Sequence, residues 1–217
     1  EFEKPEDFYQ VYARHRTYVP AVARRKHIRN FDDQFWKPSN AETAHSVLEL
    51  GCGTGLFLAY LKAKGVSDFP GVDGDPKVRE FMPPEIAEHV VIGDIWETIA
   101  GLERQFDRIV LFDVFEHFSP YEGRRLMVTL RGLLKPGGMV VMRLPNAASP
   151  WGLQYQFNDL THKAMYGPGS LSQLALAAGY ETVARLSVRR GSPLRRFVES
   201  LVQGTLDRVL TEPPPLG

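Results

Sequence analysis

Cysteine is almost absent from this sequence, because Cys52 is the only one in 217 residues. A lone cysteine excludes an internal disulfide and any metal site built from cysteines, and it favours a reducing compartment. Long apolar runs are missing too: none approaches the roughly 20 residues of a membrane-spanning helix, and the first residues lack the apolar stretch of a signal peptide. We therefore expect a cytoplasmic protein.

An excess of charge of one sign is absent as well. The chain has 26 basic and 26 acidic residues, so it lacks the overall positive field with which many proteins gather nucleic acid. We expect no nucleic-acid partner. The chain does have an ordinary content of apolar residues, 43%, on a length that suits one sizeable core and is short for two full domains.

Strand-like and helix-like patterns alternate from Ser46 onward, which predicts an α/β fold. The expected fold is Rossmann-like, a doubly wound and mostly parallel sheet, with an N-terminal helical segment in which Pro20 separates two short helices. We divide the chain into an N-terminal segment or lid (1–40), a core (41–192) and a C-terminal amphipathic helix with its tail (193–217). Strands are expected at 46–50, 69–73, 89–92, 107–112, 138–144 and 180–188, and helices at 56–64, 76–82, 95–100, 120–134 and 171–178.

The stretch VLELGCGTG, residues 47–55, is the most informative in the chain. Three glycines follow an apolar strand and precede a helix, which places bare backbone N–H groups and a helix N-terminus where open α/β sheets bind ligands. A nicotinamide dinucleotide fingerprint would need glycine at position 56, where this chain has Leu56. The spacing therefore favours another ligand, although a plain strand-to-helix turn can also use glycine.

Aspartates end the next two predicted strands. Asp73 follows the glycines by about 20 residues, where an acidic side chain can accept hydrogen bonds from a ribose diol. Asp94, in VVIGDIWE, is placed to bind an adenine amino group, and it can also cap the following helix because the two roles do not conflict. Asp75, which precedes Pro76, is the expected cap of the helix after Asp73.

These stretches, with FDRIVLFDVFEHF at 106–118 and LLKPGGMVVMRLPN at 133–146, together resemble the class I S-adenosylmethionine-dependent methyltransferases. The resemblance runs from about Ser46 to Leu186 and implies a seven-stranded sheet with S-adenosylmethionine across the strand ends. It implies that the glycine loop approaches the methionine part, Asp73 with Gly74 the ribose, Asp94 with Ile95 the adenine, and Asp113 the methionine amino group. The glycine-loop residues meant are Gly51, Cys52, Gly53 and Gly55. One departure is that no convincing seventh strand follows Arg190.

The acceptor is predicted from a finer resemblance. LPN followed by an aromatic stretch and D-x-T-H is similar to bacterial methyltransferases that act on sugars, polysaccharide ends and other hydroxylated small molecules. Methyl transfer to a hydroxyl needs alignment and a base. His117, in the loop after the fourth strand, is the first choice of base and His162 the second. Each has another interpretation: His117 can simply support its loop, and His162 can bind substrate or hold the inserted segment.

Metal-assisted transfer is not expected, since only Asp113 with Asp159 offers a thin set of oxygen ligands. We therefore predict no metal and no sensitivity to chelators. Two alternatives to O-methylation stay open. One is N-methylation of a small-molecule amine, and the other is a scaffold or sensor that binds S-adenosylmethionine without turnover.

The two ends of the chain carry separate predictions. Tyr9, Tyr12 and Arg16 lie at helical spacing, so their helix either covers the cofactor as a lid or packs on the sheet. Residues 193–210 form an apolar stripe at helical spacing. We expect this stripe to pack within the protein or in a homodimer, and we do not favour membrane contact because its basic residues are few.

Overall fold

The computed structural model describes residues 5–9, 11, 14 and 17–186 of the chain. The predicted C-terminal helix at 193–210 lies outside these residues, as do Tyr12 and Arg16. Among the described residues, no helix is long and apolar enough to cross a membrane.

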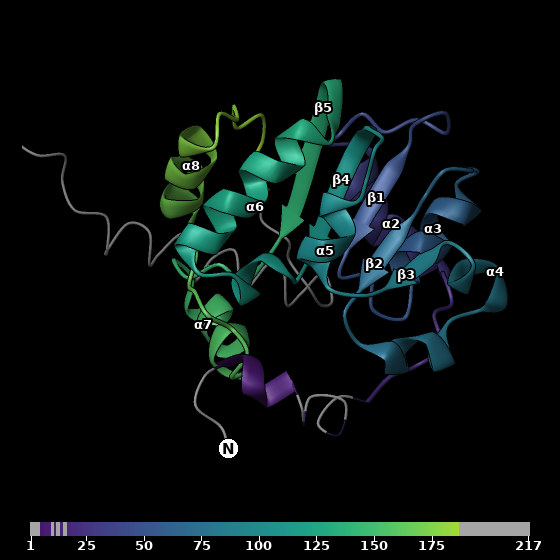
Figure 1. Cartoon of the computed structure of the whole chain (residues 1–217), viewed down its shortest axis with the longest axis horizontal. Helices are drawn as coiled ribbons and strands as arrows, with labels where there is room; N and C mark the ends of the chain where they lie inside the picture. The colour runs from purple at the N-terminus through teal and green to yellow at the C-terminus, as the bar shows by residue number, and fades with distance from the viewer. Residues whose placement is uncertain (1–4, 10, 12–13, 15–16, 187–217) are drawn as a thin grey trace, which may run out of the picture. The chain divides into compact units, whose positions relative to one another are not determined.

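Five parallel strands form one sheet in the described part of the chain, in the order β3-β2-β1-β4-β5. The order reverses between β1 and β4, which is the switch point where sheets of this kind bind ligands. This confirms the Rossmann-like, doubly wound fold (Figure 1). The strands are β1 Val47–Leu50, β2 Gly71–Asp73, β3 Val90–Ile92, β4 Phe106–Phe112 and β5 Leu134–Arg143.

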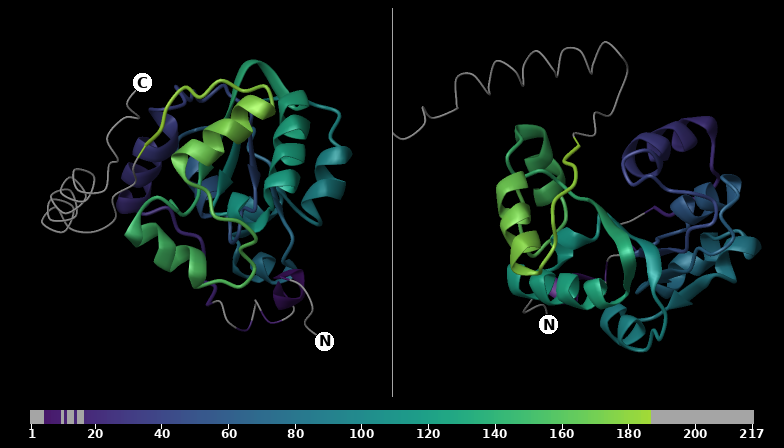
Figure 2. Two further views of the ribbon diagram at one scale, coloured as in Figure 1. Left: turned by 90° about the vertical axis from the view of Figure 1, so that its left-hand side faces the viewer. Right: turned by 90° about the horizontal axis from the view of Figure 1, so that it is seen from above.

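Helices connect the strands and cover both faces of the sheet (Figures 1 and 2). Proline at the first helical position and a capping side chain before it fix the start of α6, where Ser119 and Glu122 form a reciprocal capping box. The helices are α2 Arg25–Phe31, α3 Leu56–Ala63, α4 Pro84–Ala87, α5 Ile95–Ala100, α6 Pro120–Gly132, α7 Pro150–Phe157 and α8 Pro168–Ala177. Tighter or wider helical turns are η1 Pro5–Phe8, η2 Asp32–Trp36, η3 Pro76–Phe81 and η4 Phe115–His117.

Strand alternation divides the core into two halves. Val47 and Val110 face the half that contains α2 and α3. Leu48 and Ile109, which are the sequence neighbours of Val47 and Val110, face the half that contains α5, α6 and α8. Both faces of β1 and β4 are therefore buried, as is usual for central parallel strands.

The end of the N-terminal segment belongs to this core. Phe31 of α2 and Phe35 of η2 both pack edge-on against Phe57 of α3, with ring centroids 5.1 and 4.9 Å apart. The buried Arg108 guanidinium on β4 donates to the carbonyl oxygen of Ser39, at 2.9 Å from Nε and 2.6 Å from Nη2. Residues 25–40 are thus held against the sheet by aromatic packing and by a buried charged donor.

One predicted strand does not form in the described residues, and another begins earlier than predicted. Residues 180–186 form no strand: Val183 and Leu186 are 71% and 57% exposed, so their alternation is not matched by burial against a neighbouring strand. The strand predicted at 138–144 begins earlier, at Leu134, because Phe106 pairs with Leu134 while Arg108 pairs with Met139. An irregularity in the ladder absorbs the Pro-Gly-Gly turn between those pairs.

The Asp107 carboxylate links the start of β4 to Ser46, just before β1, and to Lys135 near the start of β5. Asp107 Oδ2 accepts hydrogen bonds from the backbone N and Oγ of Ser46, both at 2.8 Å, and from Lys135 Nζ at 2.6 Å. Partial burial alone would raise the pKa of Asp107, but the bonds from Lys135 and Ser46 outweigh it and hold the pKa well below its usual range. The charged form therefore stabilises the fold.

We expect Asp107→Ala to lower the melting temperature by about 5 °C or more at neutral pH, since it removes several charge-assisted hydrogen bonds. A depressed pKa stabilises the fold above the unfolded value of about 3.9, and this stabilisation is lost as the pH falls below it. The difference from wild type should therefore shrink in melts below about pH 4. Asp33→Ala, which removes an exposed aspartate paired with Lys37, is the control. A pH-independent difference would contradict the assignment.

Candidate functional site

The glycine loop lies at the carboxyl end of β1. The backbone N–H groups of Gly51 and Cys52 both donate to the Val72 carbonyl, at 2.8 and 3.0 Å, which fixes the loop beside β2. Gly51 has φ +70°, and a Cβ added there would lie 2.3 Å from a methyl carbon of Val114. Glycine is therefore required at this position, because the loop after β4 packs directly on the backbone of the glycine loop.

Asp73, at the end of β2, binds the same loop. Its Oδ2 accepts from the Gly53 N–H at 2.7 Å, and its Oδ1 accepts from the Asp75 N–H at 2.9 Å. Burial raises the pKa of Asp73. Asp75 caps η3 by accepting from Lys77 N, as predicted. Asp73 is thus placed beside the glycines, and contact with a ribose stays a prediction.

The other predicted cofactor residues lie along the same edge. Asp94 caps α5 through Oδ1, which accepts from Trp96 N at 2.8 Å and Glu97 N at 3.1 Å, so its capping role is confirmed. Ile95 is the first residue of that helix. Burial raises the pKa of the Cys52 thiol well above its usual range, which fits a small packing residue and not a nucleophile.

Asp113 follows β4 with φ +58°. Its carboxylate forms an ion pair with Arg143, the last residue of β5, at 2.5 Å from Nη2. Arg143 also donates from Nη1 to Gln34 Oε1 at 2.8 Å, and its guanidinium lies over the Phe112 ring. Sequence reasoning missed Arg143, which positions Asp113 and draws η2 to this edge.

Glu49 is the second residue that sequence reasoning missed. It is only 3% exposed within β1, and its Oε2 has no hydrogen-bond partner among the described residues. Burial raises the pKa of Glu49, and the charge of Arg143 acts in the opposite direction. The sequence did contain a signal for Glu49, because it is a carboxyl group inside the otherwise apolar run VLEL. Buried acidic residues rarely lack a functional or paired role.

The two predicted histidines lie against each other. The rings of His117 and His162 are T-shaped, with centroids 4.7 Å apart. His117 ends η4 after β4, whereas His162 belongs to the segment between α7 and α8. The sequence proposed them as competing candidates, and the structure brings both into one site.

A hydrogen-bonded network surrounds the His117 imidazole. Its Nδ1 lies 3.0 Å from Thr161 Oγ1, which donates to Asp159 Oδ1 at 2.5 Å. The hydroxyl of Tyr9, from the predicted lid, lies 2.9 Å from the same Nδ1. The motif D-x-T-H therefore contributes Asp159 and Thr161 to orienting His117, and His162 as its neighbour.

Glu116 is the third side chain of the histidine site. It is 1% exposed, and burial raises its pKa to about 8. His162 Nε2 lies 3.9 Å from Glu116 Oε1. Sequence reasoning gave Glu116 no role, since nothing in FDVFEHF indicates that this side chain turns inward.

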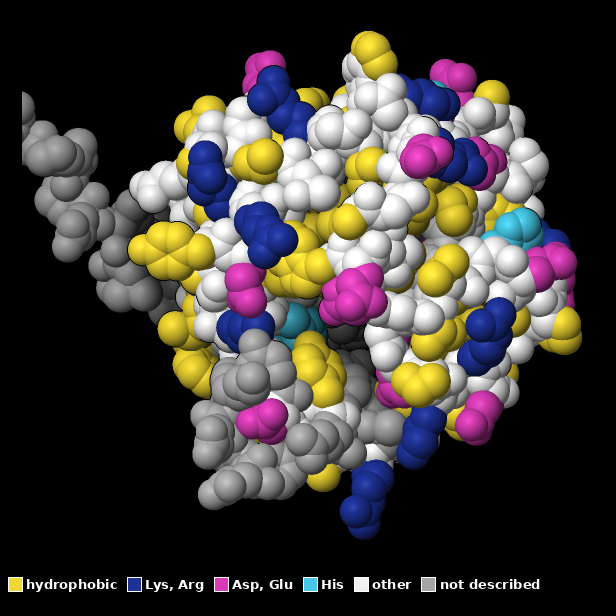
Figure 3. Space-filling view, viewed as in Figure 1, with side chains coloured by type: hydrophobic (Ala, Val, Ile, Leu, Met, Phe, Trp, Pro, Cys, Tyr) yellow, Lys and Arg dark blue, Asp and Glu magenta, His cyan; other side chains and the backbone are white. Residues whose placement is uncertain are grey.

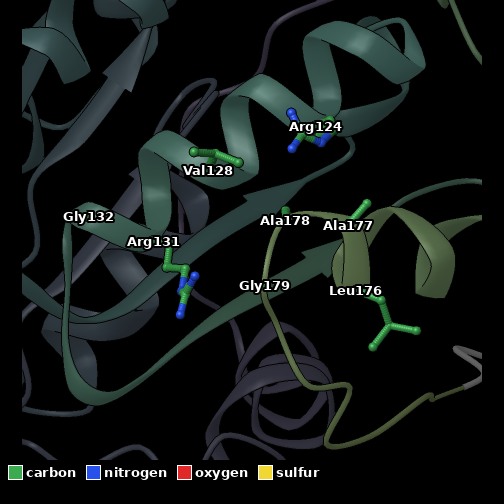
Figure 4. A pocket seen from close by; sticks show the side chains of 8 residues that line it. All are labelled: Arg124, Val128, Arg131, Gly132, Leu176, Ala177, Ala178 and Gly179. Carbon is green, nitrogen blue, oxygen red and sulfur yellow. The ribbon is translucent and has the colours of Figure 1, made fainter.

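The molecular surface is hollowed on the face seen in Figure 3, with a histidine side chain at the edge of the hollow. In Figure 1 the strand arrows point toward the edge where α7 and η1 lie. A separate hollow between α6 and α8 includes Arg124, Arg131 and Leu176 (Figure 4). It contains none of the predicted site residues.

Comparison with known proteins identifies the family. The model of a family described as a methyltransferase domain matches residues 12–185, and the chain belongs to that family. No curated protein sequence matches the chain significantly. S-adenosylmethionine is the cofactor of this methyltransferase.

Solved structures show the same fold. A SAM-dependent methyltransferase from Archaeoglobus fulgidus is 23% identical with a TM-score of 0.63, covering 87% of this chain and 88% of that one. A protein of Pyrococcus horikoshii is 21% identical with a TM-score of 0.56, over 81% and 89%. An O-methyltransferase family protein from Burkholderia thailandensis is 16% identical with a TM-score of 0.53, over 88% and 66%.

Proposed function

We propose that this methyltransferase transfers the methyl group of S-adenosylmethionine to a hydroxyl of a small molecule such as a sugar or a polysaccharide unit. The observation that carries the proposal is the contact between His117 and His162 beside the glycine loop. Val114 packs on Gly51 only three residues before His117, which supports a position of the histidine pair on the side of the glycine loop. Hydroxyl acceptors need such a group because a neutral hydroxyl is a poor nucleophile.

The cofactor residues take the roles that the resemblance implies. The close backbone approach at Gly51 and the Asp73–Gly53 hydrogen bond support a bound ligand at this loop. Transfer is an in-line displacement in which the acceptor oxygen bonds to the methyl carbon as the carbon–sulfur bond breaks. The acceptor loses its proton at the histidine pair, with His117 the first candidate to take it because Thr161 and Asp159 orient its ring. The proposed cofactor residues are Gly51, Cys52, Gly53, Gly55, Asp73, Gly74, Asp94, Ile95 and Asp113.

The proposal is tested with S-adenosylmethionine labelled in its methyl group. The full chain is incubated with monosaccharides, nucleotide sugars and short glycans, together with amino analogues of the same compounds. We expect label on a hydroxyl, and none on the matched acceptor whose hydroxyl is already methylated. Label only on amino analogues would instead indicate an N-methyltransferase. Binding of S-adenosylhomocysteine without transfer to any acceptor would indicate a scaffold or sensor.

A further inference from the structure

Three side chains of the histidine site are arranged as potential metal ligands. Glu116, His117 and His162 each offer one ligand atom, and these atoms all lie within 4.8 Å of one another. Two ligands that each lie about 2.1 Å from a zinc ion are separated by about 3.4 Å in a tetrahedral site. Side-chain movements of about 1 Å would therefore bring all three onto one ion.

The hydrogen bonds of His162 direct one nitrogen toward this point. Its Nδ1 lies 2.9 Å from the carbonyl oxygen of Gln156. Because a carbonyl only accepts, Nδ1 carries a proton, and in the neutral imidazole Nε2 therefore keeps its lone pair. That Nε2 lies 3.9 Å from Glu116 Oε1, which is too far for a hydrogen bond but within reach of a shared cation.

His117 shows the same pattern. Its Nδ1 lies 3.3 Å from the carbonyl oxygen of Thr161 and 3.0 Å from Thr161 Oγ1, whose own proton goes to Asp159. Both Thr161 oxygens accept here, which favours the tautomer with the proton on Nδ1 of His117. The Tyr9 hydroxyl, 2.9 Å from the same nitrogen, can accept as well. Histidines that bind metals typically donate their other ring N–H to a carbonyl or to a group oriented by a carboxylate.

Glu116 supplies an independent indication of a ligand. Its side chain is buried, and Oε2 has no hydrogen-bond partner among the described residues. An isolated buried carboxylate is costly unless a cation or donors satisfy it. As neutral rings in these tautomers, the neighbouring imidazoles present lone pairs toward the carboxyl group and do not donate to it.

We infer that Glu116, His117 and His162 bind a divalent transition metal ion such as zinc. Two imidazoles favour zinc over magnesium, which prefers oxygen ligands. The inference rests on the proposed function and deepens it. With the ion bound, His117 would act as a ligand and not as the base, and the acceptor proton would pass to water, because a hydroxyl bound to such an ion is more acidic than a free one. It replaces the sequence-based expectation that the enzyme has no metal and is insensitive to chelators.

The test is titration calorimetry of the full chain with zinc chloride after treatment with EDTA and dialysis. We expect one zinc ion per chain, and at least a tenfold weaker affinity in His162→Ala and in Glu116→Gln, with magnesium chloride giving no comparable binding. His89→Ala is the matched control, because His89 Nε2 also lies near a glutamate oxygen, at 3.8 Å from Glu88, but without a second histidine. This variant should bind zinc as wild type does.

Folding is checked separately through S-adenosylhomocysteine affinity, which should stay unchanged in the His162 and Glu116 variants. If either variant fails that check, Thr161→Val tests the same site by removing only the hydroxyl that orients His117, and it should weaken zinc binding several-fold. Failure of wild type to bind zinc, or equal binding by wild type and all site variants, would overturn the inference. Because no acceptor is needed, this result is independent of whether hydroxyl methylation is found.

Discussion

Gly51→Ala is expected to weaken S-adenosylhomocysteine binding at least tenfold. The new Cβ would lie 2.3 Å from a methyl carbon of Val114, and the residue would have to keep φ +70°. A left-handed backbone costs a non-glycine residue about 1–2 kcal/mol, and the overlap must also displace either the glycine loop or the loop after β4. Calorimetric titration with S-adenosylhomocysteine measures the loss.

Two further variants separate the causes. Gly132→Ala adds the same methyl group where no atom lies within 4 Å, and it should bind as wild type does. The double variant Gly51→Ala with Val114→Ala removes the overlapping methyl groups, so it should recover part of the affinity while the backbone strain remains. Unchanged binding in Gly51→Ala alone would show that the cofactor does not depend on the close approach of these loops.

His117→Ala should lower turnover roughly 100-fold or more while cofactor affinity changes little. The reason is that His117 lies in the acceptor half of the site, with its ring held by Thr161 and near Tyr9, so its loss removes activation of the hydroxyl and not binding of the donor. Single-turnover transfer of labelled methyl measures the effect. His45→Ala is the control, because it changes a histidine outside the site, whose Nδ1 accepts from the Glu42 N–H at 3.1 Å.

The result for His162→Ala ranks the two histidines. An equal loss in His162→Ala but none in His117→Ala would reverse the ranking and make His162 the group that activates the acceptor. Equal losses of turnover in both variants, together with a loss of wild-type turnover in EDTA that zinc restores, would indicate that the two rings act as ligands of one ion. A loss of cofactor affinity equal to the loss of turnover would contradict an acceptor role for either histidine.

The sheet could be predicted from sequence because each strand ends in a local signal. The glycines after β1, Asp73 at the end of β2 and Asp94 before α5 are short-range features, and their hydrogen bonds are local or join adjacent strands. Residues 180–186 show the limit of this approach. Their alternating pattern is that of a strand, but a strand also needs a partner, and pairing is decided by distant parts of the chain.

The site was predicted less completely for a related reason. His117 and His162 were each recognisable from their motifs, but their contact depends on how the segment after α7 returns to the loop after β4. The same holds for Arg143 with Asp113, which lie 30 residues apart. Glu116 was passed over because its neighbours in sequence do not tell whether a loop carboxyl faces solvent or the interior.

The strand order also bears on how the chain folds. β1, which carries the glycine loop, pairs with β2 early in the sequence, but its other neighbour is β4, and Ser46 and Asp107 bond across 61 residues. Closing so long a loop loses chain entropy before the contacts of the paired strands can offset the loss, and this slows folding. During synthesis the glycine loop is therefore made long before Val114 is available to pack on it. The cofactor pocket is completed only when the second half of the sheet has been added to the first.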